Sequence, residues 1–207
     1  MRTASRGGSY LPGATLLGVA LLLAVVSGSC SSPAPPRRID DVCTLLAERD
    51  GWWAATARAA ARWGVSPGIL LAVIYQESGF RAEARSWDRF LGIPLAPASS
   101  AYGYGQATDG AWRDYQRATG RPRARRDEFA DAVDFVGWYA DLVHRIAGVD
   151  KADAYHLYLG YHEGPGGLRR GSHEAKPWLL EVAGRVDERA ARFERDAERC
   201  TAEGPAA

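Results

Sequence analysis

The feature that most constrains this chain is an apolar run, Ile69 to Ile74, together with the residues that follow it. A segment that is apolar on every side belongs in the interior of a protein, because exposing it to water costs free energy. The run then delivers a carboxyl group, Glu77, shortly before Gly79, a residue type that often ends helices in the left-handed conformation. The sequence therefore predicts a helix that ends near Ser78 and carries a carboxylate to the edge of the core.

Glu77 is expected to hold its proton more tightly than a carboxyl group in water. Leu70, Val73 and Ile74 lie at positions i−7, i−4 and i−3 before it, so an apolar helix face runs up to the carboxylate. Burial and the partial negative charge of the helix end both raise the pKa. A raised pKa suits general acid catalysis. A glutamate in a final helical turn is also compatible with an ordinary surface position.

Helical periodicity extends over most of the remaining chain, and no strand-length alternating run interrupts it, so the fold class is mainly α. Glycine and proline predict a loop over 81–100 and a turn over 164–167. The expected helices cover 40–63 (with a break near Asp50-Gly51), 67–78 (capped by Ser66), 108–120, a segment opened by Asp127, 153–161 and 176–200.

The N-terminal segment, residues 1–29, has the organisation of a secretory signal peptide. Arg2 and Arg6 precede an apolar stretch over 16–26, and small residues follow at 27–29. The alternative is a membrane span, but the stretch is shorter than the ~20 residues that a spanning helix needs. Export of the chain to the periplasm is therefore expected.

The end of this signal, Val25 to Cys30, resembles a bacterial lipoprotein processing site, in which Cys30 would become the lipidated first residue. Residues 30–38, rich in serine and proline, would then form a tether from the outer membrane to a folded domain over 39–200, with a disordered tail at 201–207. Ordinary cleavage, which releases a soluble secreted protein, is the alternative.

The cysteine count and the net charge indicate which covalent bonds and which partners to expect. The chain has three cysteines, and if Cys30 carries lipid, Cys43 and Cys200 remain as an even pair suited to a disulfide in an oxidising compartment. With 26 basic and 25 acidic residues, nothing favours nucleic acid as a partner. No spacing of histidine, cysteine or acidic residues suggests a metal site. We expect a monomer without metal or cofactor.

Two glycine-rich segments accompany the first apolar run. Residues 101–107 (AYGYGQA) precede a predicted helix, and residues 160–167 (GYHEGPGG) end another. Glycines allow a backbone to approach a ligand closely, and Gln106 offers both a donor and an acceptor to an amide or hydroxyl group. Together with the segment that carries Glu77 they make three, and three such segments in one chain favour a binding site more strongly than any one of them alone.

In this order the three segments resemble the motifs of the bacterial soluble lytic transglycosylases, a family with a helical, goose-type lysozyme-like domain. The resemblance covers about 65–178 and rests on 77–80, 103–106 and 161–164. It implies that peptidoglycan glycan strands are the substrate, that Glu77 is the catalytic acid and that Tyr161 assists it. The residues it implies for substrate binding are Ser78, Tyr104, Gln106, His162 and Glu163.

The chain departs from the family pattern at two motifs. Tyr104 and Gly105 stand where the family has Leu-Met, while His162 and Glu163 replace the Asn-Ala of its third motif. These two residues bring an imidazole and a second carboxylate near the site, unless they are exposed turn residues. The segment between the first two motifs is also longer than usual and would form a lid or a subsite wall.

The resemblance implies cleavage of the β-1,4 bond after N-acetylmuramic acid with formation of a 1,6-anhydro end, a reaction that needs one carboxyl group. A hydrolytic muramidase of goose type is the first alternative, and a non-catalytic glycan-binding lipoprotein is the second. The muramidase needs a water-positioning carboxylate, for which the candidates are Asp88, Asp109 and Glu163. The tryptophans expected to line a glycan groove are Trp87, Trp112 and Trp178.

Overall fold

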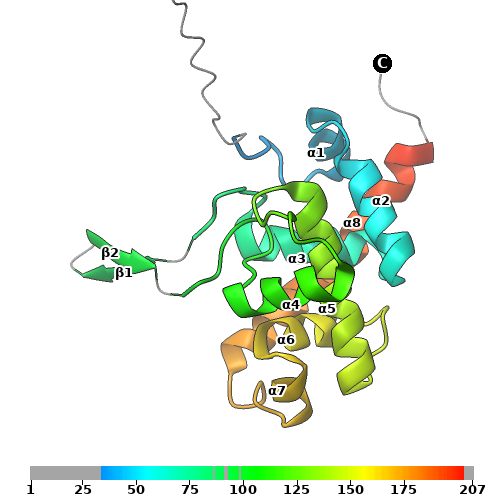
Figure 1. The fold of residues 1–207 in the computed structure, drawn as a ribbon. Coiled ribbons are helices and arrows are strands. Elements are labelled where there is room, and N and C mark those ends of the chain that lie inside the picture. The colour runs from blue at the N-terminus through cyan, green and yellow to red at the C-terminus, as the bar shows by residue number, and fades with distance from the viewer. Residues whose placement is uncertain (1–33, 86, 91–92, 98, 203–207) are drawn as a thin grey trace, which may run out of the picture. The chain divides into compact units, whose positions relative to one another are not determined.

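The computed structural model describes residues 34–85, 87–90, 93–97 and 99–202. The predicted signal peptide, the lipidation site Cys30 and most of the predicted tail lie outside the described residues. The elements in chain order are α1 (Val42–Glu48), α2 (Trp52–Trp63), α3 (Pro67–Ser78), β1 (Trp87–Phe90), β2 (Ile93–Pro97), α4 (Asp109–Thr119), α5 (Phe129–Ala147), α6 (Ala154–Glu163), α7 (Pro165–Arg169) and α8 (Pro177–Ala202). The mainly α fold class is confirmed (Figure 1).

The apolar run forms the central helix α3, which packs against α8, α5 and α2. Residues 70–72 and Ile74 are fully buried, as expected for a helix that is apolar on all sides. Gly68 lets α8 approach closely, because a Cβ atom there would lie 2.4 Å from the backbone oxygen of Ala190. Its amide also donates to the Glu194 carboxylate at 2.6 Å. The burial of α3 thus depends on α8 and on the absence of a side chain at residue 68.

Both predicted caps of α3 are present. The Ser66 hydroxyl accepts a hydrogen bond from the Ile69 amide, and Gly79 ends the helix with φ of 58°. Phe80 follows with φ of 59°, a conformation that costs a non-glycine residue free energy. Its fully buried ring packs against Trp52 and Tyr75, and this burial offsets the cost. The chain therefore turns sharply just after Glu77.

The prediction of a loop over 81–100 was wrong in part. Strands β1 and β2 form an antiparallel hairpin with a register shift between Asp88 and Arg89, and Figure 1 shows the hairpin projecting away from the helices. Pro94 and Pro97 suggested a loop, but a two-stranded sheet consists of edge strands, where proline is tolerated. The segment between the first two motifs is therefore a protruding hairpin.

The turn predicted over 164–167 is also different in the structure. Pro165 begins the short helix α7, where its missing N–H is not needed and its fixed φ fits the first turn. Leu168 anchors this helix in the core. The other predicted helices are confirmed, with ends that differ by at most two residues.

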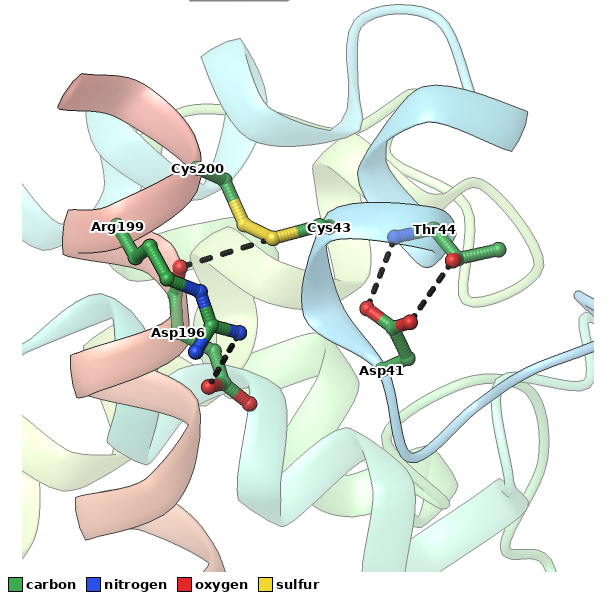
Figure 2. Close-up of a disulfide and its surroundings, with 6 residues drawn as sticks. All are labelled: Asp41, Cys43, Thr44, Asp196, Arg199 and Cys200. Atoms are coloured by element: carbon green, nitrogen blue, oxygen red, sulfur yellow. Dashed lines mark hydrogen bonds and ion pairs between the residues drawn. A yellow bond between two sulfur atoms is a disulfide. The ribbon is translucent and has the colours of Figure 1, made fainter. Parts of the chain in front are cut away.

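The predicted disulfide is present and joins the two ends of the domain. Cys43 in α1 bonds to Cys200 near the end of α8, with a Cα–Cα distance of 5.5 Å (Figure 2). The Asp41 carboxylate caps α1 by accepting hydrogen bonds from the amide and hydroxyl groups of Thr44. The bond from the Thr44 amide is the main reason that the pKa of Asp41 is lowered. Across the described part of the chain, none of the helices has the length and apolar character needed to cross a membrane.

Candidate active site

Glu77 lies in the last turn of α3 and has the raised pKa expected from the sequence. Desolvation by the surrounding protein raises its pKa from 4.5 to about 7. A hydrogen bond from the hydroxyl of Tyr158 on α6 favours the ionised form and partly offsets this effect. At neutral pH, the group is therefore present in both protonation states.

Tyr158 is a site residue that the motifs did not reveal. It is buried, and both burial and the neighbouring Glu77 raise its pKa, so its hydroxyl remains a donor. The signal that could have identified it is helical spacing: Tyr158, Tyr161 and His162 lie at i, i+3 and i+4 and share one face of α6. A tyrosine one turn before the third motif was therefore a candidate partner for the acid.

Tyr161 links the third motif to the second. Its hydroxyl donates to the backbone oxygen of Gly105 at 2.5 Å, and its ring packs against Tyr139 and Phe135. Burial and the charge of Glu77 raise its pKa well above 10. A Cβ atom at Gly105 would lie 3.0 Å from this hydroxyl. The glycine of the second motif thus makes room for the tyrosine of the third.

Gln106 holds the second motif in a strained conformation. Its φ is 47°, and its side-chain amide donates to the backbone oxygens of Ala84 and Gly103, both at 2.8 Å. Arg126 supports the same loop by donating to the backbone oxygens of Ser100 and Ala107. The amide nitrogen of Gln106 is therefore engaged with the protein itself. This leaves its side-chain oxygen as the group that could face a ligand.

Two expected substrate contacts do not fit their positions in the structure. Ser78 is 2% exposed, and its hydroxyl donates to the backbone oxygen of Ile74. Tyr104 is equally buried and packs edge-on against Trp52 and Phe129. Burial raises the pKa of Tyr104 to about 12. Both side chains therefore belong to the core of the domain.

Glu163 is an anchored carboxylate rather than an exposed turn residue. Its side chain is 5% exposed and accepts hydrogen bonds from Lys176 at 2.6 Å, from Ser172 and from His162 at 3.0 Å. The Lys176 and Ser172 bonds are the main reasons that its pKa is lowered to about 2. A carboxylate with such a low pKa is a weak base.

The three groove tryptophans differ in their surroundings. Trp112 is buried and donates from its indole nitrogen to the backbone oxygen of Ala124, so its assignment to the groove was wrong. Its amphipathic helix buries this ring instead of exposing it. Trp178 is 53% exposed at the start of α8. The side chain of Trp87 lies outside the described part of the structure.

The described residues contain no group of three or more histidine, cysteine or acidic side chains positioned to hold a metal ion. The site consists of a desolvated carboxyl group, two tyrosines and a tightly held glycine-rich loop. Its chemistry is that of proton transfer and hydrogen bonding.

A mainly helical domain that presents a desolvated glutamate at the end of its central helix belongs to the lysozyme-like class. A family model described as a transglycosylase SLT domain matches residues 18–200. The chain therefore belongs to this transglycosylase family, and membership supports a lytic transglycosylase that acts on peptidoglycan. No curated protein matches the chain.

Proposed function

We propose that this protein cleaves the β-1,4 bond between N-acetylmuramic acid and N-acetylglucosamine and leaves a 1,6-anhydromuramic acid end. The observation that supports this proposal is the state of Glu77. Glu77 accepts a hydrogen bond from the Tyr158 hydroxyl and has a pKa of about 7. Such a pKa suits a single group that must first donate a proton and then accept one.

In the proposed reaction, Glu77 donates its proton to the glycosidic oxygen while the bond from C1 to that oxygen breaks. The leaving sugar departs with a free hydroxyl group, and the substrate's own acetamido group stabilises the positive charge at C1. The Glu77 carboxylate then removes the proton of the C6 hydroxyl, whose oxygen forms the new bond to C1. Glu77 ends protonated, as it began, and no water is consumed.

Tyr158 and Tyr161 have separate roles in this proposal. Tyr158 stabilises the carboxylate form of Glu77 between the two proton transfers, because a hydrogen bond to the charged form favours it. Tyr161 acts indirectly, since its hydroxyl is bonded to Gly105 and fixes the loop beside the acid. The side-chain oxygen of Gln106 would accept a hydrogen bond from an acetamido or hydroxyl group of the glycan.

The hydrolytic alternative needs a second carboxylate that positions water. Glu163 is held by Lys176 and has a pKa of about 2, and Asp109 forms an ion pair with Arg126 at 2.9 Å. These two ion pairs favour a structural role for Glu163 and Asp109 over the activation of a water molecule. The side chain of the third candidate, Asp88, lies outside the described part. The one-carboxyl route is therefore the better supported of the two.

Mass spectrometry of digested peptidoglycan tests the proposal. Wild-type protein is expected to release fragments with anhydro ends, whereas Glu77→Gln releases none while keeping a native circular dichroism spectrum. Glu188→Gln, the same change at an exposed position on α8, is the matched control and keeps activity. Reducing ends would establish the muramidase instead. Peptidoglycan binding without cleavage by the wild type would establish a non-catalytic binder.

The proposal for location and assembly comes from the sequence alone. We infer export to the periplasm with a lipid on Cys30, and a monomeric domain over 39–200 linked to the outer membrane by residues 30–38. Metabolic labelling with a fatty acid tests the lipid: wild type incorporates label, whereas Cys30→Ser does not. Label-free wild-type protein in the periplasmic fraction would instead indicate ordinary cleavage.

A further inference from the structure

A pocket of about 220 Å³ lies between α2, the start of α5 and the loop that follows α4. Its apolar lining consists of small side chains: Ala55, Ala59 and Ala130. Three guanidinium groups and one carboxylate complete the lining: Arg58, Arg62, Arg121 and Asp134. The pocket therefore combines a surface of methyl groups with an excess of positive charge.

The Asp134 carboxylate holds two of these arginines in place. Asp134 is 7% exposed and accepts hydrogen bonds from Arg62 at 3.1 Å and from Arg121 at 2.9 Å. The indole of Trp63 and the hydroxyl of Tyr115 donate to the same carboxylate at 2.9 and 2.7 Å. Because four donors already surround its two oxygens, the carboxylate has little capacity left for a ligand. Its role is to orient the two guanidinium groups.

The third arginine, Arg58, has a charge that the protein does not neutralise. Arg58 lies one helical turn before Arg62 on α2 and is exposed. It forms no hydrogen bond or ion pair with any residue that the structure describes. A guanidinium group presents its N–H donors in a planar fork that matches the two oxygens of a carboxylate. Arg58 is therefore free to bind an anion that enters the pocket.

Charge and size restrict what this anion is. Three guanidinium groups face two carboxylates, Asp134 and the Asp131 that pairs with Arg121, which leaves one positive charge for a monoanion. A volume of about 220 Å³ is below the roughly 300–1,000 Å³ of pockets that enclose a drug-sized ligand. A carboxylate with one small aliphatic group suits this volume and the methyl-lined surface, whereas a disaccharide is too large.

The pocket is separate from the site at Glu77. Asp134 faces the pocket, whereas Val136, two positions later and on the opposite side of α5, lies against Gly105 of the second motif. The diameter of a helix, about 10 Å, therefore separates the pocket from that motif. A ligand in the pocket is a different group from the sugar that is cleaved.

We propose that this pocket binds the free carboxylate end of a peptide whose last residue has a small side chain, and that it holds a stem peptide of peptidoglycan away from the cleaved bond. Arg58 and Arg62 donate to the two carboxylate oxygens, and the terminal methyl group packs on the three alanines. Stem peptides fit this description because they end in alanine with a free carboxylate. The inference rests on the proposed function, since it takes peptidoglycan as the ligand.

Titration of the full chain with N-acetyl-D-alanyl-D-alanine, followed by NMR of the alanine methyl groups, tests the pocket without any need for turnover. The wild type is expected to show saturable shifts at Ala55, Ala59 and Ala130. Arg58→Gln is expected to raise Kd about tenfold through the loss of one charge-assisted contact. Arg113→Gln is the matched control, because Arg113 is exposed on α4 and has no partner among the described residues; it leaves Kd unchanged.

Two other ligands and one further variant keep the test decisive. The C-terminal amide of the same peptide is expected to bind at least tenfold more weakly than the free acid, and inorganic phosphate more weakly than the peptide. Ala130→Leu, which fills the exposed side of the pocket, is expected to raise Kd. Equal affinity for acid and amide, equal affinity for phosphate and peptide, or an unchanged Kd in either Arg58→Gln or Ala130→Leu would overturn the proposal.

Cleavage assays on two substrates show whether the pocket acts through the peptide. Arg58→Gln is expected to raise KM several-fold for intact peptidoglycan and to leave KM unchanged for glycan strands from which an amidase has removed the peptides. An equal rise on both substrates would refute the role of the stem peptide. If wild-type protein cleaves neither substrate, the proposed function fails, and the titration still decides whether the pocket binds the peptide.

Discussion

Replacing Glu77 by glutamine is expected to stabilise the folded protein at alkaline pH. The pKa of Glu77 is raised from 4.5 to about 7 on folding, so between these values the folded state binds more protons than the unfolded state. Stability therefore falls as the pH rises through this range. At about 1.4 kcal/mol per pKa unit, the ionised carboxylate costs about 3 kcal/mol of folding free energy above pH 7.

Urea unfolding of both proteins at pH 4 and pH 8 measures this cost. Glutamine has nearly the same shape and retains an acceptor for the Tyr158 hydroxyl, but it does not ionise. The two proteins are expected to unfold with equal free energies at pH 4. Glu77→Gln is expected to be more stable by about 2–3 kcal/mol at pH 8.

Glu163→Gln is the matched control because the shift of Glu163 has the opposite sign. Its pKa is lowered to about 2, so its stabilising contribution is present above pH 4.5 and is lost as the pH falls through 2. Since its partner Lys176 is partly exposed, we expect a loss of about 1–2 kcal/mol at pH 8 that shrinks in acid. Parallel pH dependence in the two variants, or none in Glu77→Gln, would refute the burial argument.

Two further changes test the surroundings of the acid, and a third tests the disulfide. Tyr158→Phe removes the bond that favours ionised Glu77, so the pH profile of cleavage should move to higher pH; a shift to lower pH would contradict this. Gly105→Ala places a Cβ atom 3.0 Å from the Tyr161 hydroxyl and should cost about 1–3 kcal/mol in urea unfolding; unaltered stability would show that the loop yields freely. The double variant Cys43→Ser, Cys200→Ser should lose about 2–5 kcal/mol, and reductant should do the same to wild-type protein but not to the variant.

The sequence predicted best those structural features that are determined by residues within a single segment of the chain. The helix α3 was predictable with both ends because Ser66, Gly79 and the apolar run all act within one segment. The hairpin of β1 and β2 was missed because strand pairing depends on a partner segment, and its prolines suggested only a loop. Rules that act within one segment therefore predict the helices but not the pairing of two short strands.

The site was predictable only in part, for a related reason. Glu77 and its raised pKa followed from the apolar face of its own helix. Its bond to Tyr158 and the anchoring of Glu163 by Lys176 join separate elements, so no spacing within one motif indicates them. The burial of Ser78 and Tyr104 likewise depends on which side of each motif faces the core.

The balance at Glu77 explains how a single carboxyl group could serve in both proton transfers. Desolvation favours the protonated acid, and the Tyr158 hydroxyl favours the carboxylate, which together bring the pKa to about 7. A second carboxylate in the place of Tyr158 would favour only the protonated form, because two like charges at close range cannot both ionise easily. Tyr158 remains neutral, since burial and Glu77 raise its own pKa. A neutral donor beside the acid therefore supports both states, and this is what a one-carboxyl mechanism requires.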